Sequence, residues 1–161
     1  MTEQVTVLFV DDEPLILRMI KRELARSQFR LLFAESADAA LAIVGAEPVH
    51  VVVSDMRMPA MTGLQFLDIM RAVQPHVIRV MLTGQADMES TLAAINKAHV
   101  HHFLTKPWDP TVLRETLQHC AELVSGVTHL ADTKAGAVIT LDPDLEQLEL
   151  DTFLREFQTM S

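Results

Sequence analysis

The sequence predicts an α/β fold, a doubly wound parallel sheet of five strands with helices on both faces. Short apolar runs rich in β-branched residues alternate along residues 1–125 with segments of helical spacing. Parallel strands need crossover connections, and strands covered on both faces are almost continuously apolar, as VTVLFV and VHVVVS are. The chain has 161 residues, of which 49% are hydrophobic and 22% charged, so it can form one domain with a proper core and an extension.

Five runs have the length and composition of strands. They are Val5–Val10, Phe29–Ala34, Val49–Val53, Val77–Leu82 and His101–Thr105.

Helical spacing is clearest after the first and last of these runs. Ile16, Ile20 and Leu24 share one helix face, as do Leu113, Leu117, Cys120 and Val124. Ser36 is expected to cap the second helix, Gly45 with Pro48 to end it, and Asp109-Pro110 to start the last one.

Composition excludes several classes of protein. No apolar run reaches the roughly 18–20 residues needed to cross a bilayer, and the N-terminus lacks the basic region of a signal peptide. Cys120 is the single cysteine, which excludes an internal disulfide, and we interpret it as part of the core of a cytoplasmic protein. The net charge is −9 and no Lys/Arg cluster is evident, so we expect neither direct nucleic-acid binding nor a membrane partner.

Residues 126–161 differ from the rest. Seven acids and two basic residues give this segment a net charge of −5, more than half the charge of the chain. Asp142-Pro143 can start a helix in which Leu150, Phe153, Leu154 and Phe157 form an apolar stripe. We therefore divide the chain into a domain, 1–125, and a linker with an acidic amphipathic tail, 126–161. The tail is either a connection to an output region or a helix that docks on this domain or a partner.

Charged and hydroxyl groups follow four of the predicted strands. Asp11 and Asp12, then Glu13, follow the first strand, Asp55 the third, Thr83-Gly84 the fourth and Thr105-Lys106-Pro107 the fifth. In a doubly wound sheet these loops open onto the same edge, so three carboxylates, a hydroxyl and an ammonium group converge.

Such a cluster predicts a cation. Carboxylates about 4 Å apart repel by roughly 4 kcal/mol per pair at an effective dielectric constant of about 20. A hard divalent ion relieves this repulsion, and Mg²⁺ typically uses one or two carboxylates while leaving room for a phosphate. Asp55 would then be both metal ligand and nucleophile, with Lys106 and the Thr83 hydroxyl binding phosphoryl oxygens.

FVDDEP, VVSDMRMPAMTG, VMLTGQAD and FLTKPW together resemble the receiver domain of bacterial two-component response regulators over about residues 4–125. The wording DMRMP and FLTKPWD is similar to receivers that precede HD-type phosphodiesterase or enhancer-binding output domains. The resemblance implies a (βα)₅, flavodoxin-like fold with strand order 2-1-3-4-5. It also implies that Asp55 accepts a phosphoryl group from a phosphohistidine of a sensor histidine kinase or phosphotransfer protein.

The resemblance implies a role for individual residues. Mg²⁺ would be ligated directly by Asp12, Asp55 and the Arg57 main-chain carbonyl, and through water by Asp11. The phosphoryl group would be bound by Thr83 and Lys106, Phe103 would switch with Thr83, and Pro107 would follow a cis peptide bond. Arg57 and Gln85 would flank the water that hydrolyses the phosphoryl group, which predicts slow self-hydrolysis. The face from roughly Asp87 to Val124 would then change shape for an effector, an output domain or a second copy of the chain.

Other motifs have simpler interpretations. His99, His101 and His102 do not share one ligand face on a strand, so we expect no metal there. Trp108 is expected to pack at the base of the last helix, and Phe103 is compatible with a purely core role. Two rival functions stay open, a phosphorylation-independent interaction module and a Mg²⁺-dependent phosphatase with an aspartyl-phosphate intermediate. The phosphatase fits less well, because haloacid dehalogenase-like enzymes use Asp-x-Asp on the first strand.

Overall fold

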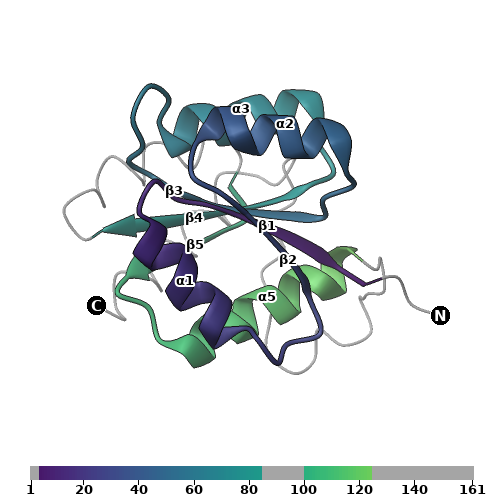
Figure 1. Cartoon of the computed structure of the whole chain (residues 1–161). Coiled ribbons are helices and arrows are strands. Elements are labelled where there is room, and N and C mark those ends of the chain that lie inside the picture. Colours follow the sequence, from purple (N-terminus) through teal and green to yellow (C-terminus); the bar gives the residue numbers. More distant parts are fainter. Residues whose placement is uncertain (1–3, 85–99, 125–161) are drawn as a thin grey trace, which may run out of the picture.

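The computed structural model describes residues 4–84 and 100–124, which form one parallel sheet between two layers of helices. Helices α2 and α3 cover one face of the sheet, and α1 and α5 cover the other (Figure 1). In chain order the elements are β1 (Thr6–Val10), α1 (Pro14–Glu23), β2 (Arg30–Ala34), α2 (Ala37–Ala46), β3 (Val51–Asp55), α3 (Gly63–Val73), β4 (Ile78–Gly84), β5 (His102–Lys106) and α5 (Pro110–Val124).

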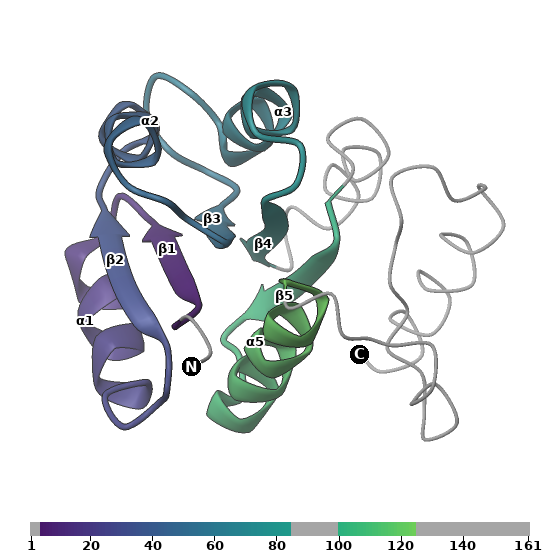
Figure 2. The same ribbon diagram turned by 90° about the vertical axis from the view of Figure 1, so that its right-hand side faces the viewer.

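The strand order is β2-β1-β3-β4-β5 and every pair is parallel, as the resemblance implies (Figure 2). All five predicted strands are present, but three of them end later than the predicted runs do, among them β5, which ends at Lys106. β3 continues through Ser54 to Asp55, which pairs in register with Leu82, and β4 continues to Gly84. Backbone pairing with a neighbouring strand therefore extends past the point where hydrophobicity stops.

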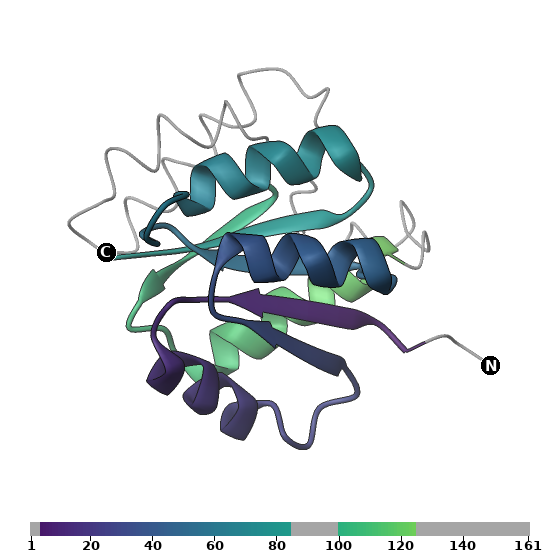
Figure 3. The same cartoon turned by 45° about the horizontal axis from the view of Figure 1, so that its top comes forward.

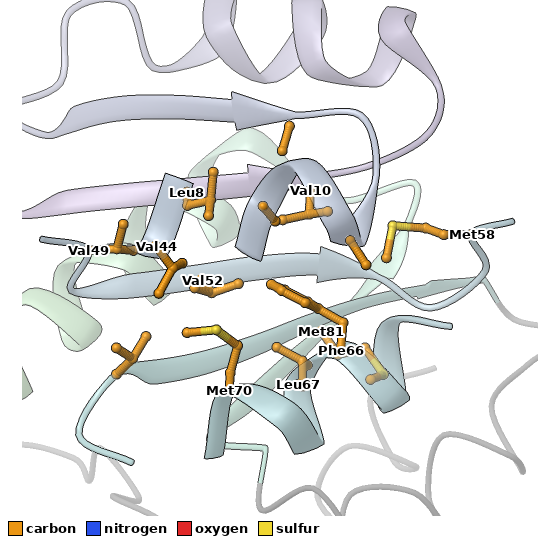
Figure 4. Close-up of a cluster of buried hydrophobic side chains, with 14 of the residues drawn as sticks. Leu8, Val10, Val44, Val49, Val52, Met58, Phe66, Leu67, Met70 and Met81 are labelled. Carbon is orange, nitrogen blue, oxygen red and sulfur yellow. The ribbon is translucent and has the colours of Figure 1, made fainter. Parts of the chain in front are cut away.

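Alternating side chains divide the interior into two cores. Leu8, Val10 and Val52 point toward α2 and α3, where Phe66 and Met70 pack against them (Figure 4). Their neighbours Val7, Phe9, Val51 and Val53 face α1 and α5. Every residue of β1 and β3 is buried, because these strands lie inside the sheet with helices above and below.

Helix α2 lies alongside α3 (Figure 3). The N-termini of three helices are capped by side chains. Ser36 Oγ accepts a hydrogen bond from the Ala39 amide at 3.1 Å, and Asp109 Oδ1 accepts one from the Thr111 amide at 2.8 Å, so both predicted caps are confirmed. Thr62 and Gln65 form a capping box at α3.

The predicted end of α2 at Gly45 with Pro48 is confirmed for Pro48 but not for Gly45. Gly45 lies inside the helix, which ends at Ala46, and Glu47 is extended with φ −137° and ψ 150°. The residue before a proline is driven into an extended conformation, so Pro48 ends the helix without a left-handed glycine cap.

Several expectations fall outside the described residues. These are Gln85, His99, the helix expected after Asp87, and the tail of residues 126–161. The boundary between domain and tail at residue 125 therefore stays a prediction. Among the described residues, no helix is long and apolar enough to cross a membrane.

Gly63 is the position where the chain after β3 approaches the strand most closely. A Cβ atom at residue 63 would lie 1.8 Å from the Asp55 carbonyl oxygen and 2.8 Å from the Asp55 carbonyl carbon. The Gly63 amide donates to the Met56 carbonyl oxygen at 2.9 Å, which holds the start of α3 against the end of β3. Only glycine fits at position 63 without a shift of the backbone, because a Cβ atom there would overlap the Asp55 carbonyl group.

Two histidines lie at the start of β5, His101 just before the strand and His102 as its first residue. His101 Nδ1 accepts a hydrogen bond from the Arg79 amide at 2.9 Å. The Nε2 atom of His102 is buried and makes no hydrogen bond within the described residues. Burial, with the nearby His119 as a second cause, lowers the pKa of His102 to about 4. Residues 101 and 102 therefore behave as structural histidines.

We predict that Gly63→Ala destabilises the protein by about 2–3 kcal/mol, because the new methyl group must displace the backbone of Asp55. The control is Gly45→Ala, which lies in a helix with no atom within 4 Å of the added Cβ and should gain about 0.5–1 kcal/mol. Urea unfolding followed by circular dichroism measures both. Equal effects of the two substitutions would contradict the close approach at Gly63.

We also predict a contribution of His102 to acid sensitivity. The unfolded histidine, with a pKa near 6.5, binds a proton that the folded one refuses, so stability falls as pH drops from 6.5 toward 4. Between pH 7 and pH 5 this amounts to about 2 kcal/mol. His102→Gln should lose that part of the pH dependence of unfolding free energy, whereas the exposed His76→Gln should keep it. Parallel pH profiles for the two variants would refute the assignment.

Candidate functional site

Three carboxylates meet where β1 and β3 end. Asp11 and Asp12 follow β1, and Asp55 is the last residue of β3. The two strands are neighbours with Val10 opposite Ser54, so the residues after them are brought side by side. One oxygen from each carboxylate lies within 4.8 Å of the others. The predicted convergence of Asp11, Asp12 and Asp55 is therefore present in the structure.

The environment of these acids is not that of an ordinary surface cluster. Asp11 is 1% exposed and Asp55 6%, whereas Asp12 is more accessible to solvent. Burial raises the pKa of Asp55, and the neighbouring carboxylates of Asp11 and Asp12 raise it further, while the hydrogen bond from Lys106 opposes them. The site thus holds more negative charge than its burial favours, and it attracts cations.

Lys106 supplies positive charge from the end of β5. Its Nζ atom donates to Asp11 Oδ2 and to Asp55 Oδ1, both at 2.9 Å. Burial would lower the pKa of Lys106, but the hydrogen bonds and charges of the two carboxylates outweigh it and raise the pKa. The ammonium group therefore links the ends of β1, β3 and β5, which are separated widely in sequence.

The loop that carries Lys106 is anchored on its other side. The Lys106–Pro107 peptide bond is cis, as the resemblance implies. Trp108 packs partly buried against the α1–α5 core, and its Nε1 donates to Glu23 Oε2 at 2.8 Å. The predicted packing of Trp108 is thus confirmed in outline, but its partner on α1 was not anticipated.

Thr83 and Phe103 lie on the same face of the sheet, on adjacent strands. Thr83 is opposite Thr105 in the register and Phe103 opposite Met81, so their side chains point toward the α2 and α3 side. Both are buried, and the Thr83 hydroxyl donates to the Gly84 carbonyl oxygen at 3.3 Å. Thr83 also follows Leu82, the residue that pairs with Asp55, so it belongs to the edge where the carboxylates gather.

The donor set fits a divalent cation such as Mg²⁺. Three carboxylates converge, one of them accessible, and hard cations prefer oxygen ligands. Asp11, Asp12 and Asp55 are the one group of three potential metal ligands found among residues 4–84 and 100–124. Arg57 is exposed in the loop two residues after Asp55, and its role as a main-chain ligand stays a prediction.

Two contributions to the site were missed by sequence reasoning. The Glu13 amide donates to Asp11 Oδ1 at 2.9 Å and orients that carboxylate, and Glu23 holds Trp108 from 85 residues away. A helix start directly after Asp12 could have revealed the first contact. No sequence signal identifies the second, because it depends on how α1 packs beside the β5–α5 loop.

The family model for the response regulator receiver domain matches residues 7–118. The hydrogenase transcriptional regulatory protein HoxA of Cupriavidus necator is 38% identical over 120 residues, which are 74% of this chain and 25% of HoxA. FixJ, a transcriptional regulatory protein of Rhizobium meliloti, is 30% identical over 73% of this chain and 57% of its own length. The chain thus spans only about a quarter to three fifths of the length of these curated relatives.

Solved structures agree with this match. The signal receiver domain of an HD domain-containing protein from Pseudomonas fluorescens has a TM-score of 0.74 at 29% identity, covering 78% of this chain and all of that one. The chemotaxis response regulator CheY4 of Vibrio cholerae has a TM-score of 0.66 at 29% identity, covering 73% of this chain and 99% of that one. The family model, the relatives and the solved structures therefore agree, and the chain belongs to the response regulator receiver domain family of two-component signalling.

Proposed function

We propose that Asp55 is a phosphoacceptor that takes a phosphoryl group from a phosphohistidine on a sensor histidine kinase or phosphotransfer protein. The observation that supports this best is the shared contact of Lys106 with Asp55 and Asp11 inside a cluster of three carboxylates. An oxygen of the Asp55 carboxylate attacks the phosphorus atom, the phosphorus–nitrogen bond breaks, and the histidine nitrogen leaves with the electron pair and takes up a proton. The product is an acyl phosphate on Asp55.

Each residue in this proposal has a physical task. Asp12, Asp55 and the Arg57 carbonyl would hold Mg²⁺, and Asp11 would act through a water molecule. The ion would neutralise charge on phosphoryl oxygens and reduce repulsion among the acids. Lys106 binds a second phosphoryl oxygen and keeps the position of Asp55 defined before reaction. The Thr83 hydroxyl donates a long hydrogen bond, of 3.3 Å, to the Gly84 carbonyl oxygen, and it can exchange that acceptor for a phosphoryl oxygen.

We propose that the same exchange starts a switch. When Thr83 turns toward the phosphate, space opens beside β4, and Phe103 on the adjacent strand can respond because both side chains lie on one face. The surface from roughly Asp87 to Val124, of which residues 100–124 are described, then binds an effector protein, an output domain or a second copy. A phosphate can shift this equilibrium only by its differential interaction with the two states.

Two further side chains, Arg57 and Gln85, would determine how fast water hydrolyses the acyl phosphate. Arg57 is exposed beside Asp55 and offers no general base, and Gln85 is equally unsuited to activate water. We therefore propose slow self-hydrolysis. The rival functions make different demands: an interaction module requires no labelling of Asp55, and a phosphatase requires turnover of a small phosphate ester such as p-nitrophenyl phosphate.

Treatment with acetyl phosphate and Mg²⁺ should add the mass of one phosphoryl group to the intact protein. Asp55→Asn should abolish the addition, because an amide is not a nucleophile for phosphorus, and Asp68→Asn on the exposed surface of α3 should leave it unchanged. Intact-mass spectrometry with peptide mapping locates the label. Equal labelling of the Asp55→Asn variant would contradict the proposal, and full release of phosphate from p-nitrophenyl phosphate by the wild type would favour the phosphatase.

The Mg²⁺ site predicts two opposite effects of one substitution. Asp12→Asn removes a negative charge from the cluster, so without Mg²⁺ the melting temperature should stay the same or rise. With saturating Mg²⁺ the melting temperature of the wild type should rise by roughly 2–4 °C per kcal/mol of stabilisation by the bound ion, and the variant should lose most of this rise. Asp38→Asn on α2 is the control. If Mg²⁺ raises the melting temperature of the Asp12→Asn variant as much as that of the wild type, Asp12 is not a ligand of the ion.

A further inference from the structure

Helix α1 presents an unusual outer surface. Leu15 and Met19 are 68% and 49% exposed, although they are large apolar side chains. Arg18 and Arg22 are exposed as well, and the spacing of 15, 18, 19 and 22 places all four on one side of the helix. We call these four residues the α1 stripe.

Charge makes this stripe distinctive in an acidic protein. The chain carries a net charge of −9, yet the exposed charges on α1 are Arg18, Lys21 and Arg22. None of the three forms an ion pair with a residue that the structure describes. The expectation of no Lys/Arg cluster is therefore wrong locally, because the helix gathers three cations around two apolar side chains.

The composition of residues 142–157 is complementary to this stripe. Six acids and Arg155 give the segment a net charge of −5. Its apolar positions Leu150, Phe153, Leu154 and Phe157 have the same i, i+3, i+4, i+7 spacing as the α1 stripe. Two helices with these patterns can bury apolar side chains between them while acids meet arginines at the rim.

The connection is long enough to let the segment reach α1. Helix α5 ends at Val124, on the same face of the sheet as α1, and the Gln28 amide nitrogen after α1 donates to the Gln118 side-chain oxygen on α5 at 3.0 Å. Residues 125–141 can span on the order of 50 Å when extended, whereas α1 with its ten residues is about 15 Å long. A tethered segment also has a local concentration in the millimolar range, so modest affinity suffices.

We propose that the acidic amphipathic segment, residues 142–157, docks on the α1 stripe of its own chain. The stripe begins three residues after Asp12, beside the carboxylate cluster. The docking itself does not depend on phosphorylation.

The test uses the full-length chain with one cysteine on each side. Met19→Cys combined with Leu154→Cys places thiols in the middle of both stripes, and native Cys120 does not interfere because burial raises its pKa to about 12. The control pair is Ala39→Cys with Leu154→Cys, since Ala39 is exposed on α2 across the sheet. Oxidation with diamide and non-reducing electrophoresis with mass spectrometry measure cross-linking within one chain and between chains.

We expect intrachain cross-linking to be roughly tenfold faster for the Met19 pair than for the Ala39 pair, in line with a docked segment. Adding Arg18→Glu and Arg22→Glu should remove this advantage, and further adding Glu149→Lys and Asp151→Lys should restore it. Arg71→Glu on α3 should have no effect. Equal rates for the two cysteine pairs, cross-links only between chains, or insensitivity to the charge reversals would each overturn the proposal, whatever the outcome of phosphorylation assays.

Discussion

The site depends on one electrostatic constraint: two buried carboxylates, Asp11 and Asp55, must share positive charge. At about 4 Å and an effective dielectric constant of about 20, two such charges repel by roughly 4 kcal/mol, and burial adds a desolvation cost. Lys106 offsets this cost by donating to both acids at 2.9 Å. Since these residues come from β1, β3 and β5, the ends of all three strands must stay at one edge. The fold and the chemistry therefore rest on the same contact.

The surrounding structure limits how far that contact can move. Gly63 allows α3 to begin directly against the Asp55 carbonyl, and Trp108 ties the loop after Lys106 to Glu23 on α1. The contact at Gly63 positions Asp55 and the contact of Trp108 positions Lys106, from opposite faces of the sheet. Such positioning matters for phosphoryl transfer, where geometry and charge neutralisation supply most of the catalysis. Thr83, whose hydroxyl donates to the Gly84 carbonyl oxygen at 3.3 Å, is the group that the proposed function requires to change its acceptor.

Local patterns predicted much of this arrangement. Apolar runs located every strand, and Ser36 and Asp109 marked helix starts because capping is decided within a few residues. Convergence of Asp11, Asp12, Asp55 and Lys106 followed from topology alone, since parallel strands share one carboxyl edge. Interactions between distant segments were beyond reach: Glu23 with Trp108 depends on helix packing, and the extension of β3 to Asp55 depends on pairing with β4. Gly45 misled because glycine is also tolerated inside a helix whose end is set by a proline.

Helix α1 brings together two surfaces of opposite charge. Its N-terminus follows Asp12, where three carboxylates lie together, and farther along it exposes Arg18 and Arg22 next to Leu15 and Met19. The carboxylate cluster and the basic, partly apolar surface of α1 therefore lie next to each other. Because screening weakens contacts between exposed charges over about 10 Å at 0.1 M salt, these two attractions act only at short range. Under the proposals above, occupation of α1 and phosphorylation of Asp55 are thus two separate events that involve different residues.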